Sequence, residues 1–366
     1  MGRDLSVSRQ CGFAPHQQAK QSGLSLIFMY NERTMKQIDK LKKLLAGISD
    51  KDSICILMHN NPDPDALAAA YGLQALFAYQ CKAVADIIFN GIIGRMNNRQ
   101  MVKLLEIPIR HLSTVNLNDY RHICLVDSQS GMRNNSFPTG HPAFIVVDHH
   151  PAGDNKFQCE FLDHRMNTGS TSTIIASYLK EFNIPLSRKL ATALFYGIKT
   201  DTDGLARDSS EKDRQLFFSL YPEIQPELLS QIENPDLPKK YYHDVGDAVL
   251  SGQVYEHILV ADTDQTFNPD MPAEMADFFL RMEGVKIVLV HGQYKNTLHF
   301  SLRTSMDGIR LGGLAILMVE GIGTAGGHSR AAGGQIPYTS ENLRIMLERF
   351  YHFFAVEPGQ FQPLYS

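Results

Sequence analysis

Residues 143–151 read Ala-Phe-Ile-Val-Val-Asp-His-His-Pro. The five apolar residues that open this stretch predict a short buried strand. One acid and two imidazoles, Asp148, His149 and His150, follow the strand directly. Side chains of this kind at the end of a strand indicate a chemical site, and the rest of the chain shows whether others join it.

Two earlier stretches repeat the pattern. The apolar run 54–58 leads into His59-Asn-Asn-Pro-Asp-Pro-Asp65, and the run 122–126 closes on Asp127. A further strand is predicted at 83–89, and helices are predicted at 35–45, 66–79 with Asp65 as its N-cap, 97–105, 170–182 and 187–200. Alternating strands and helices predict an α/β fold, with a parallel sheet covered by helices on both faces. In such sheets ligands bind beyond the carboxyl ends of the strands, where these polar residues stand.

The second half of the chain has a different pattern. A helix is predicted over 215–232, and Asn234-Pro-Asp-Leu-Pro238 marks a boundary. Beyond it we predict strands at 254–260, 285–291 and 297–302, helices at 311–319 and from a Ser340 cap to Phe354, and a glycine-rich loop at 321–334. We therefore expect a disordered lead-in over 1–34, a catalytic domain over 35–232, a linker over 233–245, a smaller α/β domain with a mixed sheet over 246–356, and a tail over 357–366.

The composition restricts the class of protein. With 366 residues the chain is long enough for two domains, and its hydrophobic fraction of 43% is ordinary for a globular protein. The net charge of −4 disfavours a protein that grips long duplex nucleic acid by its phosphates. A small anionic substrate, held by a few local cations or metal ions, stays open.

The cysteines and the apolar stretches indicate a compartment. The five cysteines are scattered without a Cys-x-x-Cys spacing, which indicates a reducing environment and no zinc ribbon. No apolar stretch approaches the roughly 18–20 residues that a membrane span needs. We therefore expect a cytoplasmic protein with no membrane partner.

The acids and histidines at the strand ends form one candidate site. Alone, each has an ordinary explanation, such as a helix cap for Asp65 or a turn residue for Asp201. Together they would repel one another unless cations compensated them. Two divalent cations roughly 3.5–4 Å apart can hold a nucleophilic water and clamp a phosphoryl group. Mixed carboxylate and imidazole ligands suit Mn²⁺ better than Mg²⁺, and zinc would more often recruit cysteine.

Four short motifs resemble, in order, those of the DHH phosphoesterase superfamily. They are His59-Asn-Asn-Pro-Asp-Pro-Asp-Ala66, Asp127-Ser, Asp148-His-His-Pro151 and Gly197-Ile-Lys-Thr-Asp-Thr202. The resemblance implies that His59, Asp63 and Asp127 hold a first metal ion. It implies that Asp65, Asp127, His149 and Asp201 hold a second, with Asp127 bridging. His150 would face the phosphate, and Asp148 would orient its neighbours.

A fifth motif, Gly326-Gly-His-Ser-Arg-Ala-Ala-Gly-Gly334, resembles the Gly-Gly-His motif of the C-terminal domain that accompanies this superfamily. Glycines let backbone N–H groups approach an anion, and His328 and Arg330 add directed donors. Arg303, at the end of a predicted strand, can join them because a guanidinium matches phosphate oxygens. We expect Gly326, Gly327, His328, Arg330, Arg303 and His150 to bind the substrate.

Several activities fit these motifs. The first is a nanoRNase and pAp phosphatase that cleaves two- to five-nucleotide RNAs and 3′-phosphoadenosine 5′-phosphate with Mn²⁺, with Co²⁺ or Mg²⁺ as substitutes. The alternatives are a cyclic-di-AMP or pApA phosphodiesterase, a RecJ-like single-strand exonuclease, and a nucleotide-binding sensor without turnover. The expected partners are short oligonucleotides or phosphorylated nucleotides, and a homodimer stays open.

Overall fold

The computed structural model describes residues 35–132, 134–138, 140–152, 158–327 and 329–365. The chain divides into two compact units. The first contains residues up to Asn60 together with Asp65–Asn90 and Pro108–Glu223, and the second contains Asn61–Pro64, Gly91–Ile107 and the chain from Ile224 onward. The lead-in expected over 1–34 lies outside the described residues.

A six-stranded sheet with the order β3-β2-β1-β4-β5-β6 forms the centre of the first unit. Each neighbouring pair of strands is parallel, which confirms the predicted parallel sheet. Every residue of β1 and β5 is buried, as expected of strands that are covered on both faces. The strands are β1 (Ile54–Leu57), β2 (Ala85–Phe89), β3 (Ile109–His111), β4 (His122–Val126), β5 (Ala143–Asp148) and β6 (Cys159–His164).

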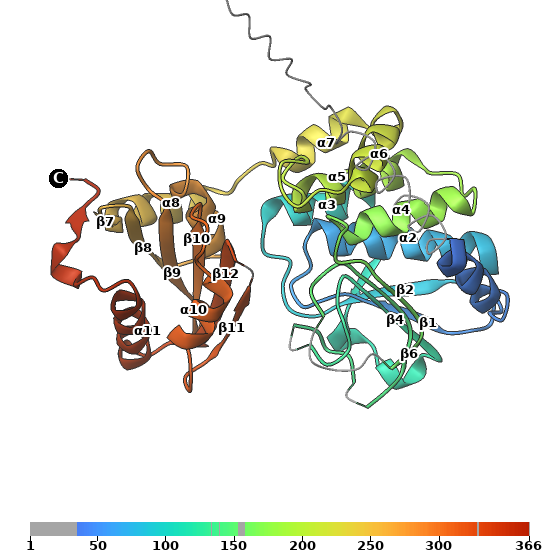
Figure 1. Cartoon of the computed structure of the whole chain (residues 1–366), viewed down its shortest axis with the longest axis horizontal. Coiled ribbons are helices and arrows are strands. Elements are labelled where there is room, and N and C mark those ends of the chain that lie inside the picture. Colours follow the sequence, from blue (N-terminus) through green and yellow to red (C-terminus); the bar gives the residue numbers. More distant parts are fainter. Residues whose placement is uncertain (1–34, 133, 139, 153–157, 328, 366) are drawn as a thin grey trace, which may run out of the picture. The chain divides into compact units, whose positions relative to one another are not determined.

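The longer helices of this unit lie along one side of the sheet (Figure 1). They are α2 (Pro64–Cys81), α4 (Thr171–Glu181), α5 (Arg188–Asp201), α6 (Glu211–Leu220) and a helix over 35–45. The opposite side holds an apolar cluster around Leu57, Leu125 and Val146, which packs against side chains such as Leu117 and Phe137. On that face the cover expected from helices comes from loop segments and the 3₁₀ turns η1 (Leu112–Thr114) and η2 (Leu117–Asp119).

The expected single helix over 215–232 is divided. The helix α6 ends at Leu220, the 3₁₀ turn η3 covers Tyr221–Glu223, and α7 covers Pro226–Glu233. Pro222 and Pro226 explain the division, because proline lacks the backbone N–H that a helix interior uses. None of the helices in the described part of the chain is long and apolar enough to cross a membrane.

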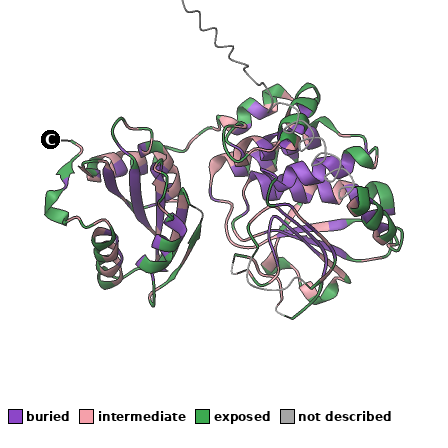
Figure 2. Ribbon diagram, viewed as in Figure 1, coloured by how far each residue is buried: buried purple, intermediate pink, exposed green. Residues whose placement is uncertain are grey.

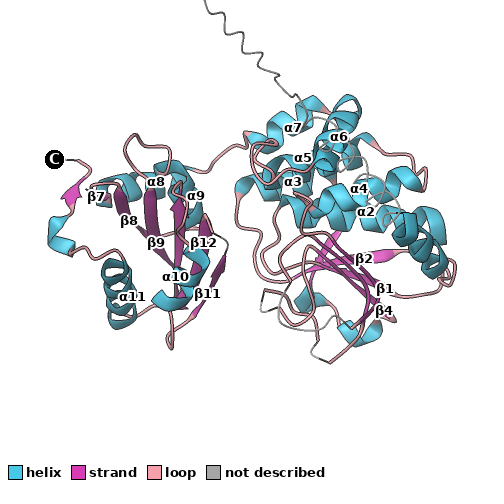
Figure 3. Ribbon diagram, in the orientation of Figure 1, coloured by secondary structure: helices cyan, strands magenta, loops and turns pink. Residues whose placement is uncertain are grey.

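The second unit contains a mixed sheet, as the sequence predicted (Figure 3). Its seven strands have the order β11-β12-β10-β9-β8-β7-β13. The pair β8 and β9 is parallel, and the other pairs are antiparallel. The strands are β7 (Gln253–Tyr255), β8 (Ile258–Gln265), β9 (Ile287–Tyr294), β10 (Thr297–Thr304), β11 (Thr324–Gly327), β12 (Ala331–Pro337) and β13 (Gln362–Pro363). The helices are α3 (Met96–Leu105), α7, α8 (Lys239–Ser251), α9 (Met271–Phe279), α10 (Leu311–Met318), α11 (Ser340–Phe353) and the 3₁₀ turn η4 (Pro358–Gln360).

Alternating residues of the central strands fill two separate cores of this unit, so its sheet is buried on both faces (Figure 2). On one face Leu289 and Phe300 pack with residues of α10 and α11. On the other face Val288 and Val290 pack with residues of α8 and α9. The period of two along β9 therefore separates the two cores.

Three sequence-based expectations for this unit are wrong in detail. The segment expected as a linker over 233–245 contains half of α8, whose Tyr241 and Val245 pack against a core. The expected glycine-rich loop contains the antiparallel strands β11 and β12. The final helix is capped by Thr339, whose side chain accepts from the N–H of Asn342, instead of by Ser340.

Candidate metal centre

The polar residues predicted from the sequence gather at the carboxyl ends of neighbouring strands. His59 lies just beyond β1, Asp127 follows β4, and Asp148 ends β5. The strand order runs outward from β1 in both directions, so the winding reverses between β1 and β4. His59 Nε2 and Asp127 Oδ2 lie 3.5 Å apart at this reversal. A reversal of this kind leaves a crevice beyond the strand ends, where α/β proteins bind ligands.

Three residues form a first group of metal-ligand atoms. His59, Asp63 and Asp127 each offer one atom, and the three atoms lie within 4.8 Å of one another. Asp127 is only 1% exposed and has a left-handed backbone, with φ of 55°, directly after β4. These are the residues that the resemblance implies for the first metal ion.

A second group consists of Asp65, His149 and Asp201, whose ligand atoms also lie within 4.8 Å of one another. His149 Nε2 lies 3.1 Å from Asp201 Oδ2 and 3.5 Å from Asp127 Oδ1. Asp127 also forms a group with His149 and His150. Asp127 therefore belongs to groups on both sides of the site, as a carboxylate between two cations would.

Backbone carbonyls orient the two imidazoles. The Nδ1 of His59 lies 2.9 Å from Asn60 O, and the Nδ1 of His149 lies 3.1 Å from Thr168 O. A carbonyl oxygen only accepts, so Nδ1 donates in both rings. Each ring therefore directs Nε2 toward Asp127, and Nε2 is the atom that a metal ion can use once its proton is lost.

The first turn of α4 holds two of the carboxylates. Asp65 Oδ2 accepts from Thr171 N at 2.7 Å, and Asp65 Oδ1 accepts from Ser172 N at 2.8 Å. Thr171 Oγ1 donates to Asp127 Oδ1 at 2.9 Å. The expectation that Asp65 caps its own helix is wrong, because α2 already begins at Pro64 and the carboxylate caps α4 instead. The partial positive charge of a helix N-terminus favours carboxylates at this position.

Asp148 orients His150. Asp148 is fully buried, and its Oδ1 accepts from His150 Nδ1 at 2.9 Å. Its Oδ2 accepts from the side-chain amide of Gln129. His150 is the most exposed of the three clustered histidines, at 29% against 14% for His59 and His149. It is therefore the one best placed to meet a bound molecule.

The carboxylates raise the pKa values of two of the imidazoles. Burial lowers the pKa of His149, but Asp201, Asp127 and Asp65 outweigh it and raise that pKa to about 11. Burial also lowers the pKa of His150, and Asp127 and Asp148 raise it to about 9. Burial raises the pKa of Asp127, yet the three histidines hold it well below its usual range. Protons on the imidazoles thus compensate the carboxylates when no other cation does.

The donor set fits divalent metal ions. His149 Nε2 is buried and makes no hydrogen bond of good geometry to any described residue, although carboxylates surround it. Such an atom is costly in a protein interior unless a cation or water meets it. Carboxylate and imidazole ligands in two groups, with Asp127 in the first and next to His149 of the second, suit a pair of ions of the Mn²⁺ type.

Of the residues expected to bind substrate, Gly326 and Gly327 end β11, and Arg330 directly precedes β12. Gly327 has a φ of 146°, and a Cβ there would lie 2.4 Å from Ala332 Cα, so only glycine fits. A Cβ on Gly326 would meet no described atom within 4 Å. Arg330 is 54% exposed and pairs with Asp307 at 2.7 Å. His328 lies outside the described residues.

Arg303 makes hydrogen bonds within the second unit that the sequence did not suggest. Its Nε donates to Asp277 Oδ1 at 2.5 Å, and its Nη1 donates to Ser301 Oγ at 2.7 Å. Asp277 Oδ2 also accepts from Arg95 at 2.9 Å. Two of the three guanidinium nitrogens of Arg303 are thus engaged within the second unit, and its predicted contact with phosphate stays a prediction.

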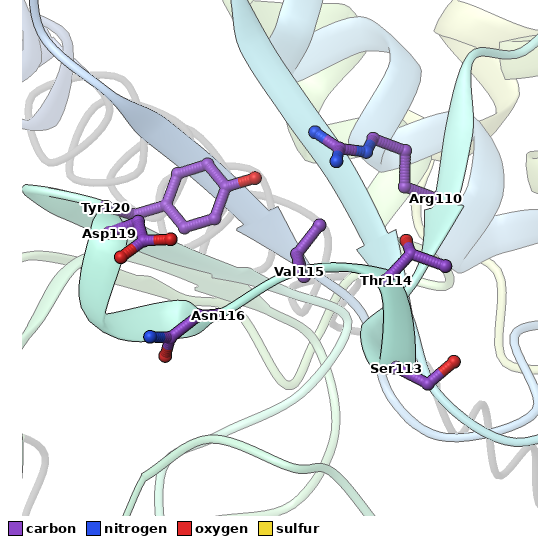
Figure 4. A pocket seen from close by; sticks show the side chains of 7 residues that line it. All are labelled: Arg110, Ser113, Thr114, Val115, Asn116, Asp119 and Tyr120. Atoms are coloured by element: carbon purple, nitrogen blue, oxygen red, sulfur yellow. The ribbon is translucent and has the colours of Figure 1, made fainter.

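A surface pocket of about 360 Å³ lies away from this cluster, between the end of β3 and the start of β4 (Figure 4). Its polar side chains serve the local structure. Arg110 and Tyr120 both donate to Asp86, and Asn116 caps η2. The pocket therefore shows no group of donors directed at a ligand.

Two family models match the chain. The DHH family, N-terminal domain, matches residues 53–198, and the DHHA1 domain matches residues 255–355. Together they cover more than half of the chain and include the glycine motif and the candidate metal ligands from His59 to His149. The chain belongs to the DHH phosphoesterase superfamily.

Curated relatives agree with this assignment. The uncharacterized protein MJ1633 of Methanocaldococcus jannaschii is 34% identical over 289 residues, which cover 78% of this chain and 58% of that protein. The probable bifunctional oligoribonuclease and PAP phosphatase NrnA of Streptococcus mutans is 26% identical over 170 residues, which cover 44% of this chain and 49% of that protein. The chain thus spans between about half and three-fifths of the length of these relatives.

Solved structures show the same fold. An exopolyphosphatase-related protein from Bacteroides fragilis has a TM-score of 0.71 at 16% identity, over 87% of this chain and 96% of that chain. RecJ from Thermus thermophilus, in complex with Mn²⁺, has a TM-score of 0.52 at 14% identity, over 88% of this chain and 55% of that chain. At these identities the likeness shows the fold alone.

Sequence reasoning missed the groups that support the ligands. Gln129, Thr168, Thr171 and Ser172 all contact a predicted site residue through hydrogen bonds. One signal was available, because Thr171 and Ser172 lie at the start of the helix predicted over 170–182, and helix N-termini bind anions. Nothing in the local pattern around Gln129 indicates that its amide reaches a residue 19 positions away.

Proposed function

We propose that this chain is a two-metal phosphoesterase that hydrolyses very short oligoribonucleotides and pAp to mononucleotides. The observation that carries the proposal is the pair of ligand groups at the reversal between β1 and β4. Asp127 belongs to the first group, and its Oδ1 lies 3.5 Å from His149 Nε2 of the second. The similarity to NrnA, which is named a probable oligoribonuclease and PAP phosphatase, supports this substrate class.

The residues divide into two metal sets. His59, Asp63 and Asp127 would hold one ion, and Asp65, Asp127, His149 and Asp201 would hold the other. When bound, two such ions acidify a water molecule and neutralise charge on a phosphoryl group. Mn²⁺ is the proposed ion because of the mixed donor set, and Co²⁺ and Mg²⁺ are the substitutes to test.

The remaining site residues would bind and orient the substrate. His150 is held by Asp148 on its Nδ1 side and is partly exposed, so it can donate to a phosphate oxygen. Gly326, Gly327, His328 and Arg330 would bind the far phosphate or base of a short substrate, with Arg303 as a further donor. A loop that captures the far end explains a preference for short chains.

We also place this activity in a reducing compartment, the cytoplasm. The four cysteines among the described residues, Cys55, Cys81, Cys124 and Cys159, are free thiols. Burial raises the pKa of the Cys55 thiol to about 12, so this cysteine is unreactive and serves as core.

One experiment separates the candidate activities. The purified full chain is incubated with Mn²⁺ and labelled RNA and DNA oligomers of two to about twenty-four nucleotides, alongside pAp, pApA and cyclic-di-AMP. Rapid hydrolysis of two- to five-nucleotide RNA and of pAp is the expected result. Preference for cyclic-di-AMP or pApA, or for long single strands, would replace the proposal with the corresponding alternative. Tight binding without turnover would indicate a sensor.

A further inference from the structure

Gln129 stands directly behind the site and takes no part in either metal-ligand group. It follows Asp127 by two residues and is only 2% exposed. Its Nε2 donates to Asp148 Oδ2 and lies 3.2 Å from both His150 O and Pro151 O. The backbone carbonyl of Gln129 accepts from Asn135 Nδ2 at 2.7 Å. A buried amide with this many contacts holds a fixed position.

The chemistry of these partners decides which atom of the amide faces them. A carboxylate oxygen and two backbone carbonyls all accept, so only an N–H can face them. His164 Nε2 lies 2.5 Å from His150 O and therefore donates to the same carbonyl from another direction. Gln129 and His164 together fix the backbone at His150, and Gln129 also holds the Oδ2 of Asp148 through a hydrogen bond.

Two carboxylates compete for the Nδ1–H of His150. The Nδ1 atom of His150 lies 2.9 Å from Asp148 Oδ1 and 3.5 Å from Asp127 Oδ1. Asp148 is the nearer of the two, and its other oxygen accepts from Gln129, a contact that opposes rotation of the carboxylate. Without that contact His150 can turn to Asp127 and occupy an oxygen that the metal ions are proposed to share.

We propose that Gln129 is a positioning residue that keeps His150 paired with Asp148 and away from Asp127. The inference rests on the proposed function for its catalytic consequence, but the geometry that it describes can be tested without turnover. Gln129, which is not a metal ligand, would orient Asp148, and Asp148 would orient His150, the residue proposed to meet the substrate.

The first test reads the imidazole directly. The full chain, labelled with ¹⁵N-histidine and loaded with Mg²⁺ to avoid paramagnetic broadening, is examined by ¹H–¹⁵N NMR, and His150 is assigned by loss of its signals in His150→Ala. We expect the downfield Nδ1–H signal of His150 to move or vanish in Gln129→Met. The matched control is Gln74→Met, because the Gln74 amide also donates, to Ala85 O at 2.7 Å, but far from the site. An unchanged His150 signal in Gln129→Met overturns the proposal.

The second test reads the catalytic consequence. Gln129→Met should lower kcat on dinucleotides by about ten- to a hundredfold, the usual cost of removing a group that orients a metal-site residue, with Mn²⁺ content unchanged. The same change should add little in a His150→Ala background, because the contact acts through His150. Full additivity of the two changes, or loss of Mn²⁺ in Gln129→Met, overturns the proposal. A wild-type chain without turnover would refute the proposed function alone, since the NMR result stands independently.

Discussion

Asp127 takes part in groups on both sides of the candidate site, and four other groups hold it in place. Its carboxylate faces His59, His149 and His150 and accepts from Thr171 Oγ1. A residue with this many directed contacts is fixed in orientation before any ion binds. Preorganisation of this kind is what a shared metal ligand requires.

Replacement of Asp127 by alanine should therefore be the most damaging single change. It would remove a ligand from both ions, so turnover should fall by more than the roughly ten- to hundredfold that supporting residues cost. Mn²⁺ content, measured by elemental analysis, should fall with it. The control is Asp86→Ala, which removes a carboxylate of the same sheet that pairs with Arg110. Near wild-type turnover in Asp127→Ala would show that the bridging assignment is wrong.

The protonated state of His149 predicts how metal affinity depends on pH. With its pKa raised to about 11, His149 carries a proton at neutral pH in the metal-free protein. A metal ion must displace this proton, so binding should strengthen as pH rises, by up to about tenfold per unit for each proton released. Calorimetry in buffers of different ionisation enthalpy should detect the released proton at pH 7. In His149→Gln the part of the proton release that comes from His149 should be lost. Metal affinity that does not change between pH 6 and 8 would contradict this account.

At the scale of elements, the N-termini of helices organise the site. The first turn of α4 binds Asp65, and the segment just before α4 is tied to α6 through Asp213. Asp213 is fully buried and accepts from Gly169 N, Ser210 N and Thr173 Oγ1. It closes the capping box of α6 and holds the approach to α4 at the same time.

Asp213→Ala should consequently destabilise the first unit. It would leave several buried donors without their acceptor, at about 1–3 kcal/mol each, so the free energy of unfolding should fall by at least about 3 kcal/mol. Urea denaturation with a chelator present measures this without a contribution from metal binding. Glu211→Ala is the matched control, since Glu211 is an exposed acid in the same first turn. A similarly small effect of both changes would refute the role given to Asp213.

The turn between β11 and β12 gives a second prediction at this scale. Arg330 is exposed and pairs with an exposed acid, Asp307, so its removal should leave the fold intact. Arg330→Ala should weaken turnover of pAp and dinucleotides by about ten- to a hundredfold, the loss expected for a charge-assisted contact to phosphate. Hydrolysis of bis-p-nitrophenyl phosphate, which has no second phosphate or base, should fall much less. Arg344→Ala, another exposed and paired arginine of this unit, serves as the control. Equal losses on both substrates would end the idea that this turn measures substrate length.

At the scale of the whole molecule, the two units carry separate sets of motifs. The candidate ligands other than Asp63 belong to the first unit, and the glycine motif belongs to the edge of the mixed sheet in the second. The family models follow the same division, over 53–198 and 255–355. Residues 1–34 precede both.

Removal of residues 1–34 should therefore leave turnover and Mn²⁺ content unchanged. The segment contributes no motif, and the helix over 35–45 already supplies Ile38, Leu41 and Leu45 to the core. The truncated and full-length chains are compared on the same dinucleotide at equal metal loading. A folded, metal-loaded truncation that has lost orders of magnitude in turnover would show that the segment completes the site.

The sequence determined the order of the main elements and the identity of the candidate ligands. The strands at 54–57, 122–126 and 143–148 lie on the expected apolar runs. Asp127 directly follows the second strand, Asp148 ends the third, and one residue separates the first from His59. This succeeds because a buried parallel strand needs a continuous apolar run, and because the strand ends place the next residues at one edge of the sheet. Which atoms meet there was implied by resemblance and not by pattern.

Tertiary structure alone decided the parts that depend on distant partners. The strand β6 contains a buried acid, Asp163, whose Oδ2 accepts from the Arg165 guanidinium and from the Tyr178 hydroxyl. The glycines at 326–334 predict a loop, yet β12 pairs with β10 and β11 pairs with β12, so these glycines lie in strands. A hydrogen bond to Asp148 fixes the position of Gln129, and a hydrogen bond from the first turn of α4 fixes that of Asp65. In each case hydrogen bonds that the folded chain supplies override the local preference, because buried polar groups must find partners wherever the fold provides them.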